Sequence, residues 1–342
     1  MSGKDKKLAE GQKKYGVIIS HGFQRRSEEP WQEAFEWIKA GNLGKLTLAR
    51  GFCYKPRKSI GKVSAPVAPP KNIDYDLWSG PRKMLPIRRT QFHYDWHWQS
   101  PYGNGDLGNQ GPHQLDVCRW ALDDPMELPK AVLSAGGRLG YDDDGDTANT
   151  QVLYAEGGVA PILFEVRGLP KKGLDWKNGM PDYRGVTIGN VLEYEGGSLL
   201  GGHSASCEAV DKNGKSIKKF KGPGDHMHSW INACHSGTQS PLHNAENGHY
   251  SSAIAHMGTH ALTLGKSTSQ EEIEEALKSK SEVKDAIERM SQHLAANGLK
   301  DAMPKLGVSL TSDGKQLTGQ FAQAANELDR EHYRKGYTLP NA

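Results

Sequence analysis

The sequence contains few cysteines and no long apolar run. The four cysteines among 342 residues are far apart, and no CxxC pair occurs, which argues against a zinc knuckle. No stretch approaches the roughly eighteen consecutive apolar residues that a membrane-spanning helix needs. The charged N-terminus is not followed by the apolar stretch of a secretory signal. These features predict reduced thiols and a cytoplasmic protein, with export still open if further residues precede Met1.

Neither positive nor negative charge is in large excess, since the formal net charge is only +3. Such a balance gives no reason to expect binding to nucleic acid. No GxSxG motif occurs, and no serine is visibly paired with a histidine and an acid, so a nucleophilic hydrolase is unsupported. The 36% hydrophobic content is typical of a globular chain, and 40 glycines with 18 prolines predict many turns and long loops.

Hydrophobic periodicity predicts a mixture of helices and strands. Apolar residues recur at helical spacing in 28–40, and the capping box of Ser269 and Glu272 predicts another helix start. From residue 130 onward, short alternating runs separated by glycine pairs predict an antiparallel sheet. The other expected elements are helices at 4–15, 225–236, 247–264 and 321–335, strands at 16–21 and 46–54, and an extended loop at 55–71.

Residues 102–122, YGNGDLGNQGPHQLDVCRWAL, hold the first candidate site. Asn109 and His113 are four residues apart, which on a helix places both side chains on one face. An amide beside an imidazole can hold a polar substrate and move a proton. The structural alternative is that Asn109 caps the helix while His113 packs among its neighbours.

Glycines in the same stretch imitate a dinucleotide-binding fingerprint. Gly103, Gly105 and Gly108 have the required spacing, but the residues before them are polar and aromatic rather than a buried strand. A turn follows the helix, where the fingerprint needs a second strand with an acidic residue. We therefore interpret these glycines as a sharp turn that begins the helix.

The aromatic segment FHYDWHW, residues 92–98, is the second candidate. Aromatic faces beside hydrogen-bonding side chains are typical of carbohydrate sites, because a sugar has apolar C–H patches and polar edges. An aromatic corner of the core is the alternative. The pairs His93/His97 and His256/His260 have helical ligand spacing, but no third ligand is indicated, so no metal is predicted. The acidic run 142–146 is interpreted as a solvated turn rather than a calcium loop.

Several of these motifs together resemble the Gfo/Idh/MocA oxidoreductases over nearly the whole chain. The similar segments are HGFQRR, IKAGNLGKLTLARGFCYKPRKSIG, YDLWSGP, FHYDWHW, YGNGDLGNQGPHQLDVCRW, SAGGRLGYDDDGDTANT, HSWINACHSGTQSPLHNAENGHYSSAIAHMG and AANELDREHYRKGY. The resemblance implies an NAD- or NADP-binding Rossmann domain followed by a C-terminal substrate domain. It further implies an α+β fold with a large, mostly antiparallel sheet and helices on one face.

The chain departs from the family pattern at two places. The substrate-domain motif usually carries aspartate four residues before the histidine, where this chain has Asn109 before His113. The glycine-rich turn and the Glu-Lys-Pro motif with its catalytic lysine do not occur. We therefore expect residues 1–27 to be the last helix and strand of a truncated dinucleotide-binding domain, and 28–342 to be the substrate and oligomerisation domain. Tight binding of NAD or NADP by this chain alone is not expected.

The resemblance implies an NAD(P)-dependent sugar dehydrogenase of bacterial carbohydrate metabolism that acts on a sugar or cyclitol. A non-catalytic sugar-binding or oligomerisation module is the alternative, and a metal-dependent hydrolase is a third hypothesis. A small sugar-like substrate and a homo-oligomer formed through the sheet are the expected partners, without nucleic acid or membrane. The candidate residues are His113 and Asn109 for catalysis, Tyr94, Trp96, His97, Trp98 and Asp116 for substrate, and Gln24 and Arg25 for the cofactor.

Overall fold

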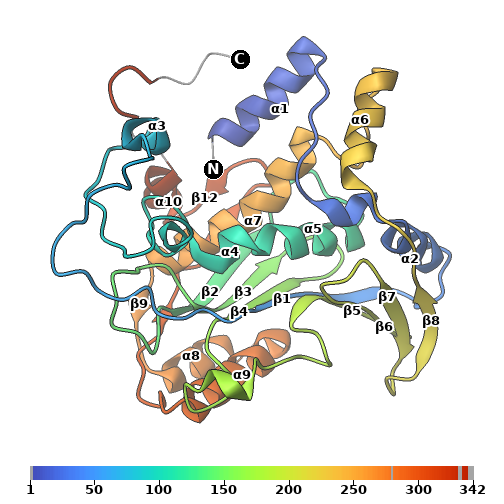
Figure 1. Cartoon of the computed structure of the whole chain (residues 1–342). Coiled ribbons are helices and arrows are strands. Elements are labelled where there is room, and N and C mark those ends of the chain that lie inside the picture. Colours follow the sequence, from blue (N-terminus) through green and yellow to red (C-terminus); the bar gives the residue numbers. More distant parts are fainter. Residues whose placement is uncertain (1–2, 279, 330–332, 338–342) are drawn as a thin grey trace.

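A large twisted sheet forms the centre of the computed structural model, which describes residues 3–278, 280–329 and 333–337 (Figure 1). Within these residues the sheet has twelve strands, in the main order β12-β11-β2-β3-β4-β1-β5-β6-β7-β8. Neighbouring strands are antiparallel except β1 and β4, which pair in parallel. The expected α+β class with a mostly antiparallel sheet is confirmed.

The strands are β1 Leu46–Tyr54, β2 Ala131–Gly137, β3 Thr150–Glu156, β4 Ile162–Arg167, β5 Ile188–Tyr194, β6 Gly197–Gly201, β7 Cys207–Asp211, β8 Ser216–Phe220, β9 Lys266–Ser267, β10 Lys305–Leu306, β11 Leu310–Ser312 and β12 Leu317–Thr318. The α-helices are α1 Gly3–Tyr15, α2 Glu29–Lys39, α3 Tyr75–Ser79, α4 Gly105–Asn109, α5 Gly111–Ala121, α6 His226–Ser236, α7 Ala245–Thr263, α8 Gln270–Leu277, α9 Ser281–Ala296 and α10 Ala322–Asp329. Short 3-10 turns are η1 Gln24–Ser27, η2 Asp95–Trp98 and η3 Trp176–Asn178.

Helices cover both faces of the central strands, rather than the one face expected (Figure 1). Along β3, Leu153 packs into the core under α5 and α7, whereas Val152 and Tyr154 pack into the opposite core with α9. Alternate residues of a strand point to opposite faces, so a strand that is apolar at successive positions needs cover on both sides. The burial of β3 on both faces therefore requires the second helical layer.

Most predicted elements occur within one or two residues of their expected bounds. Strand 46–54 is confirmed as β1, and helix 28–40 appears as α2. The capping box at Ser269 is present, and Asn244 rather than Asn247 caps α7 with its side chain. The final helix is shorter than expected: α10 ends at Asp329, residues 330–332 lie outside the described part, and 333–337 are not helical.

The strand expected at 16–21 is wrong. This segment is extended, but the structure shows it without strand pairing in the described residues, and Val17 is 47% exposed. The Ile19 amide donates instead to the Gln239 side chain at 2.9 Å. β-branched residues favour an extended backbone, yet a strand also needs a neighbour to share its hydrogen bonds.

A buried ion pair fastens the N-terminal segment to the domain. Arg26 donates to the carboxylate of Asp116 on α5 at 2.7 and 2.9 Å, and both side chains are 0% exposed. The same guanidinium donates to Asp124 at 2.7 and 2.6 Å, and the Ser251 hydroxyl donates to Asp116 at 2.8 Å. The segment between α1 and α2 is thus fixed against the start of α5.

Helix α5 lies close against β1. A Cβ atom on Gly51 of β1 would lie 2.7 Å from the Phe164 ring and 3.0 Å from the Gln114 side chain of α5. Only glycine permits this approach of helix to sheet. The first turn of α5 is therefore held at a fixed height over the sheet.

The long loop at 55–100 is tied down by charged pairs. Arg57 donates to Asp106 of α4 at 2.8 and 2.7 Å, and packs over the rings of Tyr94 and Trp98. The acidic turn 142–146 is not simply solvated, because the Asp143 carboxylate is buried and accepts hydrogen bonds from Arg138 and from the Ile60 amide.

Removal of the charge of Asp116 should destabilise the protein strongly. We expect Asp116→Asn to lower the free energy of unfolding by about 3–5 kcal/mol, because Arg26 then keeps a buried charge without its fully buried carboxylate partner. Urea unfolding followed by circular dichroism measures this. The matched control is Asp123→Asn. The ion pair of Asp123 with Lys39 is exposed, so its loss should change the free energy of unfolding by less than about 0.5 kcal/mol. Equal losses in the two variants would contradict the anchoring role.

Candidate functional site

Asn109 and His113 lie on consecutive helices rather than on one. Asn109 ends α4 and is exposed, while half-buried His113 is in the first turn of α5. Pro112 explains the break, since proline has no N–H to continue the helical ladder and disfavours helical geometry in the preceding residue. Gly105, at φ +64°, makes the sharp turn that begins α4, in agreement with the interpretation of the glycines.

The surroundings of His113 come from the N-terminal segment. Its ring meets the edge of buried Phe23 at a centroid distance of 5.9 Å. Burial lowers the pKa of His113, the charge of Asp116 raises it, and the charges of Arg25 and His226 lower it. The net direction is downward, so the neutral imidazole is favoured, as a proton acceptor requires.

Three further histidines gather around Ser27, next to Phe23. The Ser27 hydroxyl lies 2.7 Å from Nε2 of His243 and 3.1 Å from Nδ1 of His226. The ring centroids of His243 lie 5.2 Å from those of both His21 and His226. We call these four residues, Ser27, His21, His226 and His243, the Ser27 cluster.

The sequence reasoning missed the Ser27 cluster as a site. Its members come from η1, the segment before it, the start of α6 and the loop before α7, which are up to 222 residues apart. The only signal was proximity to motif segments: His21 begins HGFQRR and Ser27 follows it, His226 lies two residues before HSWINACHSGTQSPLHN, and His243 lies near the end of that segment. No helical or strand spacing connects them.

Burial lowers the pKa of both inner histidines of the cluster. The pKa of His21 falls to about 4 and that of His243 to about 3, in each case mainly through desolvation. Mutual repulsion of the imidazoles adds to the shift of His243. At neutral pH these rings are therefore uncharged, and each carries one N–H donor and one acceptor nitrogen.

The aromatic candidates form a separate group. Trp96 stacks on His97 at 3.9 Å and His97 packs on Tyr94 at 4.5 Å, whereas Trp98 is buried between Arg57 and Arg138. The recorded ring contact of His113 is with Phe23, from a different segment. The assignment of His113 and of Tyr94, Trp96, His97 and Trp98 to one substrate site stays a prediction.

Two other candidates are occupied by structural interactions, and a third is exposed. Asp116 has no free oxygen for a substrate, because Arg26 and Ser251 bind both of them in a fully buried position. Arg25 donates to Glu28 at 2.8 and 2.6 Å and to the carbonyls of residues 202 and 203. Gln24 is exposed on η1.

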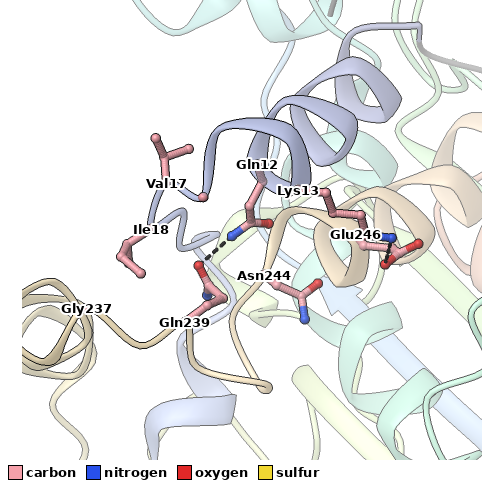
Figure 2. Close-up of a pocket in the computed structure, with 9 residues that line it drawn as sticks. Gln12, Lys13, Val17, Ile18, Gly237, Gln239, Asn244 and Glu246 are labelled. Atoms are coloured by element: carbon pink, nitrogen blue, oxygen red, sulfur yellow. Dashed lines mark hydrogen bonds and ion pairs between the residues drawn. The ribbon is translucent and has the colours of Figure 1, made fainter.

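A pocket of about 350 Å³ opens beside the N-terminal segment (Figure 2). Figure 2 shows Gln12 and Lys13 of α1 facing Gln239 and Glu246, with Val17 and Ile18 at one side. Lys13 and Glu246 form an ion pair at 2.7 Å. The pocket thus lies where the end of α1 and the segment 16–18 meet the loop before α7 and the start of α7.

The described part of the chain shows neither a group of metal ligands nor a membrane-spanning helix. It contains no group of three or more histidine, cysteine or acidic side chains placed to hold a metal ion. None of its helices combines the length and apolarity needed to span a membrane. Cys53, Cys118 and Cys207 are buried free thiols, and Cys234 is an exposed one.

Comparisons with known proteins agree with the motifs. Residues 39–165 match the family described as the oxidoreductase family, C-terminal alpha/beta domain, of Gfo/Idh/MocA type. No curated protein sequence matches the chain. The fold is similar to that of a levoglucosan dehydrogenase in complex with NADH and levoglucosan, at 14% identity and a TM-score of 0.50, covering 75% of this chain and 66% of that one.

Two further solved structures are similar at lower scores. One is the WlbA dehydrogenase from Bordetella pertussis in complex with NADH and UDP-GlcNAcA, at 15% identity, a TM-score of 0.44 and coverage of 74% and 63%. The other is an oxidoreductase from Agrobacterium radiobacter in complex with NAD+, L-tartaric acid and magnesium, at 13% identity, a TM-score of 0.45 and coverage of 73% and 64%. The chain thus spans less than two thirds of the length of these two structures.

Acid should destabilise the protein through the Ser27 cluster. The folded pKa values of His21 and His243, about 4 and about 3, lie below the ordinary 6.5, so the unfolded chain binds more protons in between. The stabilisation is therefore complete above about pH 6.5 and is lost as the pH falls toward 4, by up to about 1.4 kcal/mol per pH unit for each histidine. Urea unfolding at pH 7.5, 6 and 5 measures this slope.

The control for this prediction is His243→Gln, which keeps a polar side chain but cannot titrate. Its unfolding free energy should depend less on pH than that of the unmodified protein across the same window. His235→Gln, an exposed position on α6, should leave the slope unchanged. An unchanged slope in His243→Gln would show that His243 is not buried in its neutral form.

Proposed function

Since residues 39–165 carry the C-terminal domain of the Gfo/Idh/MocA oxidoreductases, we propose that this protein acts in NAD(P)-dependent oxidation or reduction of a sugar or cyclitol. The chemistry would be hydride transfer between a ring carbinol and a nicotinamide, coupled to transfer of the hydroxyl proton. The ligands bound in the levoglucosan dehydrogenase structure, NADH and levoglucosan, are consistent with this proposal.

His113 is the observation on which the proposal rests. It lies in the first turn of α5, within the matched segment, and its ring nitrogens make no recorded hydrogen bond in the described structure. The lowered pKa leaves it able to accept a proton at neutral pH. His113 would therefore take the hydroxyl proton of the substrate, and exposed Asn109 would hold a neighbouring hydroxyl.

Tyr94, Trp96 and His97 supply the aromatic and polar surface that a sugar would need. Tyr94 is 45% exposed, and the stacked pair of Trp96 and His97 is partly exposed. Buried Trp98 would support this surface by packing on Arg57 rather than by contacting the sugar itself. A flat, partly exposed aromatic surface binds the C–H face of a pyranose or cyclitol ring.

Residues 1–27 would be the end of a dinucleotide-binding domain, and 28–342 the substrate domain. The support is that α1 leads into an extended segment, 16–21, which has strand-forming residues but no strand partner in the described structure. The same observation favours the second candidate function, a sugar-binding or assembly module without its own cofactor site. Assembly through the sheet into a homo-oligomer belongs to both candidates.

Removal of the imidazole of His113 tests the first candidate. In a form of the protein that turns over NAD+ or NADP+, we expect His113→Ala to lower kcat by about 10²–10⁴-fold, with a much smaller change in KM. His235→Ala, at an exposed position, is the matched control. Unchanged turnover in His113→Ala would leave His113 a structural residue.

Asn109 offers a second test through the pH profile. An amide cannot titrate, so Asn109→Ala should act only through positioning of the substrate. Asn109→Asp should keep activity and raise the pH at which His113 loses its proton, because a nearby carboxylate favours the imidazolium. Turnover against pH measures both effects, and a downward shift in Asn109→Asp would contradict the assignment.

Titration with NADH distinguishes the two candidates for this chain. We expect weak binding, because residues 3–27 form a helix and an unpaired extended segment rather than a glycine-rich strand-turn-helix that binds a pyrophosphate. Fluorescence or calorimetry gives the dissociation constant. A value below about 10 μM, or roughly −7 kcal/mol, would overturn this expectation.

A further inference from the structure

The Ser27 cluster contains a chain of hydrogen-bonding groups whose direction can be worked out. It begins at the backbone amide of Phe23, which lies 3.3 Å from Nδ1 of His21. A backbone N–H can only donate, so Nδ1 of His21 is an acceptor. Neutral imidazole carries one proton, and His21 must therefore carry it on Nε2.

The next ring in the cluster is that of His243. Nε2 of His21 and Nδ1 of His243 are both buried without a recorded partner, and their rings lie 5.2 Å apart. The two atoms make no direct hydrogen bond, but a donor on His21 and an acceptor on His243 are complementary through one water molecule. An unpaired buried polar atom costs about 1–3 kcal/mol, which favours this complementary arrangement over two facing donors. His243 then carries its proton on Nε2.

The Ser27 hydroxyl links the ring of His243 to that of His226, the last ring in the chain of hydrogen bonds. This hydroxyl has a single proton and contacts Nε2 of His243 and Nδ1 of His226. If His243 donates to Ser27, the hydroxyl's own proton still needs an acceptor, and Nδ1 of His226 is the remaining partner within hydrogen-bond distance of this oxygen in the described structure, so the hydroxyl donates onward to it. Neutral His226 is then left with its proton on Nε2, which has no recorded partner and is not among the buried unpaired atoms.

We propose that His226 is a substrate-contacting residue beside His113, held with its Nε2–H outward by a one-directional hydrogen-bond chain through His21, His243 and Ser27. The cluster reaches His113 through Phe23, whose ring centroid lies 4.5 Å from that of His21 and 5.9 Å from that of His113. His226 would donate to a hydroxyl or carbonyl oxygen of the substrate while His113 accepts a proton. Ser27, His243 and His21 are positioning residues, since they act through His226.

The chain also prevents His226 from acting as the proton acceptor at Nδ1. Nδ1 accepts the proton of the Ser27 hydroxyl, so its lone pair is not available to take a proton from the substrate. The other charged groups around the cluster are Asp116, Arg26 and Arg25, of which the first two form the buried ion pair. Only the identity of the oxygen that meets His226 depends on the proposed function.

Nitrogen-15 NMR of the imidazole side chains reads the tautomers directly in the protein without ligand. At pH 7.5 we expect His226 and His243 each to be protonated at Nε2 and unprotonated at Nδ1, with His226→Asn and His243→Gln used to assign the signals. His235, exposed on the same helix, serves as the internal reference for a free histidine. A proton on Nδ1 of neutral His226 would overturn the proposal.

Variants of Ser27 test the transmission. Ser27→Ala removes the hydroxyl and should turn His226 into a mixture of both tautomers, as at His235, whereas Ser27→Thr keeps the hydroxyl and should keep the single tautomer. An unchanged His226 spectrum in Ser27→Ala would show that the chain does not set the tautomer. In a form that turns over cofactor, His226→Gln should raise KM about tenfold while kcat changes little, which corresponds to the loss of one hydrogen bond of about 1.4 kcal/mol.

Failure of the proposed function and failure of the role assigned to His226 give different results. If the tautomers are as expected but no dehydrogenase activity is found with any sugar or cyclitol, the proposed function fails and the hydrogen-bond chain stands. If activity and the effect of His113→Ala are found but KM of His226→Gln is unchanged, His226 is not a substrate contact, and the further inference fails alone.

Discussion

The buried pair of Arg26 and Asp116 determines where the candidate site lies. One guanidinium joins the segment before α2 to the second turn of α5 and to Asp124 beyond that helix. Because both side chains are inaccessible to water, the pair holds only while the surrounding packing is intact. Phe23, three residues before Arg26, is thereby placed against His113, and Ser27, one residue after Arg26, is placed against His226 and His243.

The sheet provides the second constraint on this geometry. Gly51 lets α5 approach β1, and Pro112 separates α5 from α4, so that His113 stands in a new first turn rather than inside a long helix. The second helical layer, formed by α8 and α9 on the far face, buries the other side of β3 and β4 and keeps the sheet rigid (Figure 1). The position of His113 therefore depends on backbone features as much as on its own contacts.

Burial gives the histidines around His113 their chemical character. His21 and His243 are kept from their charged forms by desolvation, and the shortage of hydrogen-bond partners then fixes which nitrogen carries the proton. This differs from an acid-histidine pair, in which a carboxylate orients the ring. Here Asn109 carries no charge, and the carboxylate of Asp116 is bound by Arg26.

The sequence by itself determined the regular elements and the family, because these depend on local spacing and on contiguous motifs. The run of apolar residues in α2, the strand β1 and the capping box of α8 could all be predicted, as could the role of Gly105 as a turn. Tertiary structure alone decided that helices cover both faces and that residues 16–21 lack a strand partner, since both depend on what packs opposite. It also decided that Asp116 is an anchor and that Ser27 meets His226 and His243, because residues some 200 positions apart come together only when α6 and α7 pack beside η1.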